Sequence, residues 1–272
     1  MKRTKKKIKI LVQIISGILL AVLVFAVAVS ENTEKLKVDS VFNESPSEKY
    51  YSSTDLDASK PMVALSFDDG PAFTYEGFNA TQEILNVLEY HGVRATFFMC
   101  GARINDYNSS CLKREIAIGC EIGNHTYDHT RYGDEVTKED ISKTSEIIKD
   151  YCGFYPTIFR CPGGIITRTI REECEQEGMP IAYWSVDTED WKSQDMDLIY
   201  EKTMEGVYDG AIILMHDIYP STAKAVKKIV PALMKKGYQI VTVSELLSAK
   251  NDGVKAAAGQ QYIDYNTINN NT

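Results

Sequence analysis

The chain has 272 residues, a length that suits one domain of moderate size or two small ones. Apolar residues make up 44% of it, which allows a substantial core and argues against general disorder. The first 30 residues carry six basic side chains and no acid, so the remainder holds 24 basic and 38 acidic residues, a net charge of −14. A domain this acidic is unsuited to binding nucleic acid, and we interpret the charge as a source of solubility.

The N-terminal residues 1–30 predict export. A basic cluster at residues 2–9 precedes twenty uncharged residues, 10–29, which as a helix would span roughly 30 Å, one bilayer core. Basic residues before the span place the N-terminus in the cytoplasm and the rest of the chain outside. We predict an uncleaved membrane anchor. A cleaved signal peptide is the alternative, because residues 26–28 and 28–30 both have the small-x-small form of a cleavage site.

Beyond the span, composition predicts a spacer, a domain and a tail. Residues 31–60 are rich in Ser, Glu, Lys and Asp and predict a polar linker. Residues 61–249 carry the apolar periodicity of a folded domain. Residues 250–272 are rich in Asn, Gln and Ala and predict a disordered tail.

Within the predicted domain, strand-like apolar runs alternate with segments of helical periodicity. Seven strands are predicted at residues 63–67, 95–99, 121–124, 157–160, 181–186, 211–216 and 239–243. Helices are predicted between them at 80–91, 110–118, 137–151 (with Thr137 as N-cap), 168–177, 195–206 and 221–236, and a short one starts at 244. This alternation favours parallel strands joined by crossover helices, in an open sheet or a barrel. Ligands then gather at the carboxyl ends of the strands.

The six cysteines all lie in the exported part of the chain, where disulfides are permitted. Their spacings contain no CxxC, so a cysteine zinc cluster is not expected. Fifteen complete pairings are open, and buried free thiols are the alternative. The residues are Cys100, Cys111, Cys120, Cys152, Cys161 and Cys174.

Residues able to do chemistry follow five of the predicted strands, and three of the four histidines are among them. His91, at a helix end, and Trp184 are interpreted as structural. The strand-end segments are Asp68-Asp69, His125-Thr126-Tyr127-Asp128-His129, Arg160-Cys161-Pro162-Gly163-Gly164, Asp187-Thr188-Glu189-Asp190-Trp191 and Leu214-Met215-His216.

Two of these segments together suggest a metal site. His125 and His129 would face the same way on one helical turn, and one carboxylate added to them gives a two-His, one-Asp set with open positions. Asp68 and Asp69 repel each other unless a cation compensates them. One of the two could then bind the metal while the other acts as a base. Adjacent side chains on a strand point to opposite faces, so we expect the strand to give way to a turn at Gly70-Pro71.

The five segments, in this order, resemble the motifs of the polysaccharide deacetylase family, also called carbohydrate esterase family 4 or the NodB homology domain. Over roughly residues 60–249, SFDDG is similar to the first motif, HTYDH to the second, RCPGG to the third, DTEDW to the fourth and LMH to the fifth. The resemblance implies an α/β fold, a distorted, incomplete (β/α)7 barrel. It also implies a hydrolase that acts on linear amides rather than peptide bonds, removing acetyl groups from a polysaccharide.

The resemblance further implies roles for the matching residues. Asp69, His125 and His129 would hold a divalent metal, most commonly zinc, with cobalt, manganese or nickel as alternatives. Asp68 would be the general base, oriented by Arg160. Such a metal polarises the carbonyl and lowers the pKa of the attacking water from ~15.7 toward ~7.

The remaining matches would protonate the leaving amine and shape the pocket. His216 would be the general acid, held by Asp190, which would raise its pKa. Trp191 and Leu214 would form an apolar slot for the acetyl methyl group. The N–H of Gly163 would bind the oxyanion.

One further position has no single assigned role, and two positions differ from the usual motif of the family. Asp187 is left with two interpretations, a hydrogen bond to Arg160 or a purely structural role. The family usually has an aromatic residue where this chain has Gly163, and often Pro where it has Cys161. These departures concern substrate fit and touch neither the metal ligands nor the proton-transfer groups.

We therefore expect a monomeric bacterial enzyme, anchored in the cell membrane with its catalytic domain outside, or secreted if the N-terminal segment is cleaved. Its substrate would be a polysaccharide containing N-acetylglucosamine, with peptidoglycan the nearest, and it would release acetate. One alternative is an O-acetyl esterase that acts on xylan or an exopolysaccharide. Another is a glycan-binding domain without catalytic activity. No nucleic-acid partner is expected.

Overall fold

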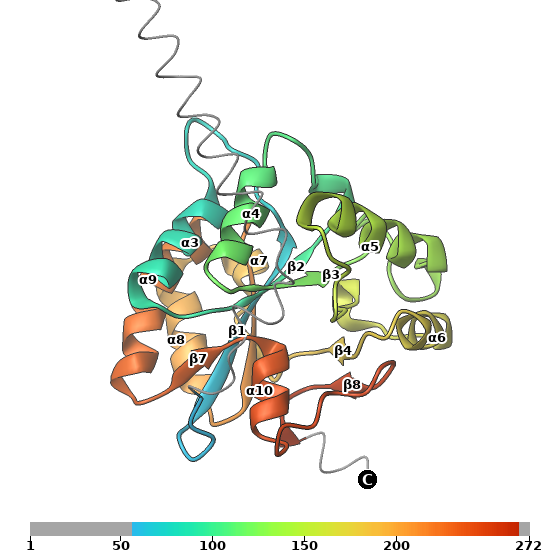
Figure 1. Cartoon of the computed structure of the whole chain (residues 1–272). Coiled ribbons are helices and arrows are strands. Elements are labelled where there is room, and N and C mark those ends of the chain that lie inside the picture. The colour runs from blue at the N-terminus through green and yellow to red at the C-terminus, as the bar shows by residue number, and fades with distance from the viewer. Residues whose placement is uncertain (1–55, 267–272) are drawn as a thin grey trace, which may run out of the picture. The chain divides into compact units, whose positions relative to one another are not determined.

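The computed structural model describes residues 56–266; the predicted anchor or signal segment, and most of the predicted linker, lie outside this range. A parallel sheet lies at the centre of the described part, with helices around it (Figure 1). The strand order is β3-β2-β1-β6-β5, and β7 also pairs with β1. The strands are β1 (Met62–Gly70), β2 (Thr96–Met99), β3 (Glu121–Asn124), β5 (Val186–Asp187), β6 (Ala211–His216) and β7 (Gln239–Val241).

Strand β1 is the centre of the sheet, and all nine of its residues are buried. Burial on both faces is the reason its sequence is a nearly continuous apolar run. β6 pairs with β1 from Val63 to Asp68, whereas β7 pairs with residues 62–64 and β2 with residues 66–70. β6 therefore pairs along most of β1, whereas β7 pairs with the first residues of β1 and β2 with the last. This change of neighbour from β7 to β2 makes the sheet irregular. The carboxyl ends of β1, β2 and β6 lie together.

The helices form a belt around the sheet, as the predicted alternation requires. In the order α8, α9, α3, α4, α5, α6, each contacts the next. Thr137 is the N-cap of α5, as predicted from the sequence, and it forms a reciprocal capping box with Asp140. The bounds are α3 (Ala80–His91), α4 (Ser109–Ala117), α5 (Lys138–Cys152), α6 (Arg168–Gln176), α7 (Asp190–Ser193), α8 (Met196–Gly206), α9 (Pro220–Lys235) and α10 (Val243–Ala249), with single 3-10 turns at Gly101–Arg103, Gly133–Glu135 and Pro162–Gly164.

Two predicted strands are much shorter in the structure. The segment 157–160 is reduced to single parallel bridges, from Phe159 to Asn124 and from Phe159 to Ile181. The segment 181–186 is divided into β4 (Ile181–Ala182) and β5, separated by three residues. Single bridges link β3 to β4 through Phe159, but β4 lies with β8 in a separate two-stranded sheet, so the described strands form a distorted barrel that is not closed.

The prediction of a disordered tail from residue 250 is wrong for residues 250–266. Residues Gln261–Tyr262 form strand β8, which pairs in parallel with β4. The Tyr262 side chain is 5% exposed and belongs to the core cluster that also contains Met62 and Leu246. Burial of one aromatic ring holds this segment on the domain. Within residues 56–266, no helix is both long and apolar enough to cross a bilayer.

Candidate active site

The end of β1 presents both aspartates to one place. Asp68 pairs in register with Phe98 and Gly70 with Met99, so Asp69 is an extra residue in a bulge, with φ of 73°. That left-handed backbone is strained for a residue other than glycine, and such strain is common at functional sites. The sequence predicted a break in the strand here, and the structure places it at Asp69, one residue before the expected turn.

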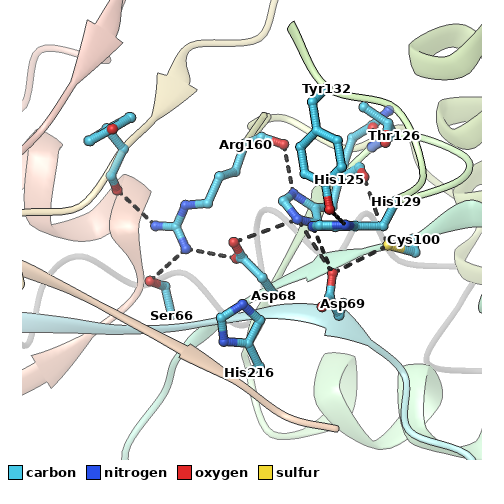
Figure 2. A network of polar contacts seen from close by, with 12 residues as sticks. Ser66, Asp68, Asp69, Cys100, His125, Thr126, His129, Tyr132, Arg160 and His216 are labelled. Carbon is cyan, nitrogen blue, oxygen red and sulfur yellow. Dashed lines mark hydrogen bonds and ion pairs between the residues drawn. The ribbon is translucent and has the colours of Figure 1, made fainter. Parts of the chain in front are cut away.

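Asp69, His125 and His129 lie together in a geometry that fits a metal ion (Figure 2). Their ligand atoms are all within 4.8 Å of one another. Asp69 Oδ1 is 3.4 Å from His129 Nε2 and 3.6 Å from His125 Nε2. Tetrahedral zinc with bonds of about 2.0–2.1 Å requires ligand atoms roughly 3.3 Å apart. His125 Nε2 is buried without a hydrogen-bond partner, as expected of a lone pair directed at a cation.

The two histidines are held by different contacts, and the prediction that they share one helical turn is wrong. Residues 125–129 are not helical, and Thr126 has φ of 64°. His125 Nδ1 lies 2.8 Å from the Arg160 carbonyl oxygen; because a carbonyl only accepts, Nδ1 carries the proton and Nε2 is free to bind. His129 Nδ1 lies 3.1 Å from the Tyr132 hydroxyl.

Arg160 is fully buried and fixes Asp68. Its Nη1 donates to Asp68 Oδ1 at 2.8 Å and to Ser66 Oγ at 2.9 Å, and its Nη2 donates to the Tyr183 carbonyl at 2.9 Å. The second oxygen of Asp68 is 3.7 Å from His125 Nε2 and therefore faces the metal site. The proposed hydrogen bond from Arg160 to Asp187 is wrong. Asp187 is exposed and accepts from the Glu189 backbone instead.

His216 and Asp190, predicted to act as a proton-transfer pair, are in direct contact. Asp190 is fully buried; its Oδ1 lies 2.7 Å from His216 Nδ1 and accepts from Trp191 N, while its Oδ2 accepts from His216 N and Thr222 Oγ1. Burial alone would lower the pKa of His216. The hydrogen bond and charge of Asp190 outweigh it and raise that pKa to about 9. The imidazole is therefore protonated at neutral pH.

The sequence-predicted pocket residues adjoin these groups along the chain. Leu214 is buried two residues before His216, and Trp191 follows Asp190 with half of its surface exposed. Gly163 lies in the turn after Arg160, with φ of 64°. Several polar partners were missed, among them three around Asp68, Arg160 and Asp190. Ser66 could have been found, because it lies two residues before Asp68 on the same strand and its side chain therefore points to the same face. The Tyr183 carbonyl has no sequence signal. Thr222 lies in α9, far along the chain from its partner Asp190 in α7.

All six cysteines are buried, and Cys100, Cys111, Cys152, Cys161 and Cys174 are free thiols, so for these five the structure favours that alternative over disulfides. Cys161 is 1% exposed and donates to the Ile165 carbonyl at 3.1 Å; burial raises its pKa to about 12. Cys100 lies beside the metal site, with Sγ 3.7 Å from Asp69 Oδ1. Buried, protonated thiols of this kind pack as small apolar groups and are poor nucleophiles.

Comparison with known proteins shows which family this chain resembles. Residues 55–182 match the family model described as "Polysaccharide deacetylase". The chain is 38% identical over 205 residues to the peptidoglycan-N-acetylglucosamine deacetylase PgdA of Listeria monocytogenes, covering 74% of this chain and 41% of that protein. The chain thus spans about two fifths of that relative's length.

Solved structures agree over the whole of the compared domains. The peptidoglycan deacetylase PdaC from Bacillus subtilis superposes with a TM-score of 0.66 at 36% identity, covering 72% of this chain and 95% of that one. A family 4 acetyl xylan esterase from Clostridium thermocellum, solved with a cobalt ion, gives 0.66 at 30% identity and covers 75% and 98%. These likenesses, with the five motifs at the ends of parallel strands, show that the chain belongs to the polysaccharide deacetylase family and has its α/β fold.

Proposed function

We propose that this protein hydrolyses the N-acetyl groups of N-acetylglucosamine residues in peptidoglycan and releases acetate. The observation that carries the proposal is the pairing of Asp68 with His216 in register on the neighbouring strands β1 and β6. A buried carboxylate fixed by Arg160 and a protonated imidazole fixed by Asp190 are thereby placed side by side, next to the metal triad. A base, an acid and a Lewis-acid site are what amide hydrolysis needs.

The triad of Asp69, His125 and His129 is proposed to bind zinc. One carboxylate oxygen and two imidazole nitrogens at these separations suit a small tetrahedral cation, although cobalt, manganese and nickel accept similar ligands. When bound, the cation would polarise the acetyl carbonyl and make the attacking water more acidic.

The chain's own residues would then move the protons. Asp68 takes a proton from the water as the water oxygen adds to the carbonyl carbon. Arg160 keeps the Asp68 carboxylate in place. The N–H of Gly163 donates to the oxyanion that forms. His216 gives its proton to the amide nitrogen as the carbon–nitrogen bond breaks, leaving acetate and a free amine. Trp191 and Leu214 are proposed to contact the acetyl methyl group.

The substrate assignment draws on the relatives and on the predicted topology. Two of the relatives described above are named as peptidoglycan deacetylases. A basic head followed by an uncharged span at residues 10–29 would keep the domain outside the cell and near the wall. We therefore propose a monomer anchored in the membrane, or secreted if the segment is cleaved.

A second candidate function is the hydrolysis of O-acetyl esters, because a related structure is an acetyl xylan esterase. The same base and metal would serve, and an ester needs less help from an acid to expel its leaving group. A glycan-binding role without catalysis is less well supported, since the described residues retain every proposed ligand, base and acid.

The test is acetate release from three substrates: peptidoglycan, chitooligosaccharide and acetylxylan, each with and without added zinc. We expect release from the first two, loss of activity with a chelator, and recovery with zinc. Asp69→Ala should lower zinc affinity and kcat/KM by at least about two orders of magnitude, since a metal supplies several kcal/mol to the transition state. Asp197→Ala, which removes an exposed aspartate on α8, is the control. A wild-type turnover in Asp69→Ala would refute the metal assignment.

A further inference from the structure

Tyr132, in the loop between the second histidine and α5, lies against two parts of the site at once. Its hydroxyl is 3.1 Å from His129 Nδ1, and its ring meets the His129 ring edge to face at 5.3 Å (Figure 2). On its other side the ring covers Gly163, where a Cβ atom would lie only 2.9 Å from Tyr132 Cδ1. The tyrosine is 43% exposed, so part of its ring remains available to a ligand.

The loop that carries Tyr132 is fixed to the loop that carries Gly163. The Gly133 backbone hydrogen-bonds the Cys161 thiol, and that thiol in turn donates to the Ile165 carbonyl. A Cβ on Gly133 would come within 2.9 Å of the Ile165 side chain, so the two loops pack without a gap. The position of the Tyr132 ring therefore follows from the fold and does not depend on a bound substrate.

The hydrogen bond to His129 has a defined direction. His129 Nε2 is the nitrogen that faces Asp69 Oδ1, at 3.4 Å, so the lone pair for a metal must be on Nε2 and the proton on Nδ1. Nδ1 then donates to the Tyr132 oxygen. Partners of this kind orient a ligating imidazole and strengthen it, and their loss typically costs 10–100-fold in metal affinity.

We propose that Tyr132 supplies the aromatic wall that Gly163 does not, and positions His129 through its hydroxyl. The inference rests on the proposed function, because the wall would contact the sugar that carries the acetamide. Position 163 has φ of 64°, which any residue with a Cβ adopts only with strain, so the ring comes from the neighbouring loop instead. One side chain thus shapes the pocket and supports a metal ligand.

Two variants separate the hydroxyl from the ring. Tyr132→Phe keeps the ring and should weaken zinc binding about tenfold, measured with zinc alone by competition against a chromophoric chelator, with KM for chitooligosaccharide unchanged at saturating zinc. Tyr132→Ala should weaken zinc equally and also raise KM about tenfold, the loss of an aromatic contact of about 1.4 kcal/mol. Tyr155→Phe, an exposed tyrosine that bonds Glu146 on α5, is the control.

Wild-type zinc affinity in Tyr132→Phe would overturn the positioning role, and an unchanged KM in Tyr132→Ala would overturn the wall. Thermal unfolding of each variant shows whether a loss comes from misfolding, which Tyr132→Phe is designed to avoid. The zinc titration needs no substrate. If wild-type protein binds zinc and releases no acetate, the proposed function fails while the hydroxyl role of Tyr132 is still read out.

Discussion

Replacement of Asp190 by Asn should move the alkaline limit of activity to lower pH. His216 must be protonated to act as the acid, so kcat/KM falls as the pH rises through its pKa, which is about 9 in the wild type. Burial opposes that charge; Asp190 raises the pKa most, and the charges of Asp68 and Asp69 raise it further. Without the Asp190 carboxylate, the pKa should fall from about 9 toward its ordinary value of about 6.5.

The size of the effect follows from these two values. At pH 7.5, about 97% of His216 is protonated with a pKa of about 9, and about 9% with a pKa of 6.5, so kcat/KM at that pH should drop about tenfold. The same difference corresponds to about 3 kcal/mol that favours the folded protein. Because this pKa is raised on folding, the stabilisation is complete below pH 6.5 and disappears as the pH rises to about 9.

Two measurements check this reasoning. Acetate release is followed from pH 5 to 10 in the wild type, in Asp190→Asn, and in Thr222→Val, which loses one hydrogen bond to Asp190 but keeps its charge. Only Asp190→Asn should lose the limb near pH 9, and only its free energy of unfolding should lack the decrease that His216 contributes between pH 6.5 and 9. An Asp190→Asn profile that coincides with the wild type would show that Asp190 does not set the acid's pKa.

Two further predictions concern stability. Arg160→Met should lower the free energy of unfolding, measured by urea titration, by about 3–5 kcal/mol, because it leaves the Asp68 charge buried and unpaired. Adding Asp68→Leu to this variant should restore much of the loss. An Arg160→Met protein whose free energy of unfolding lies within about 1 kcal/mol of wild type would contradict this. Deletion of residues 250–272 should cost at least about 2 kcal/mol by the same assay, since it removes the buried Tyr262 ring and the partner of β4, and an unchanged urea midpoint would count against that packing role.

The sequence was a good guide to the fold where each element is long. The central strand and the belt of helices followed from apolar runs and from a capped start such as Thr137. It failed where pairing depends on a single residue. Phe159 makes isolated bridges that no periodicity records, and the one buried ring of Tyr262 is too small a signal to mark a strand in an Asn- and Gln-rich segment.

The sequence predicted those parts of the candidate site in which the type of side chain indicates its chemistry, as for metal ligands. The two histidines and one of the adjacent aspartates could be grouped from residue type, and the family resemblance singled out Asp69; the structure brings the ligand atoms of Asp69, His125 and His129 together. Contacts made by backbone groups could not be predicted in this way. Every residue has a backbone carbonyl, so nothing in the sequence marks the carbonyl of Arg160 as the partner of His125. Tyr132 was missed because an exposed loop tyrosine has no pattern around it.

Arg160 serves the two halves of the site through different parts of one residue. Its carbonyl fixes the proton on His125, whereas its guanidinium fixes Asp68. Every amino acid has a carbonyl, so replacement at position 160 removes the support of the base and leaves the imidazole's tautomer in place. A substitution at position 160 alone should therefore lower turnover more than metal affinity.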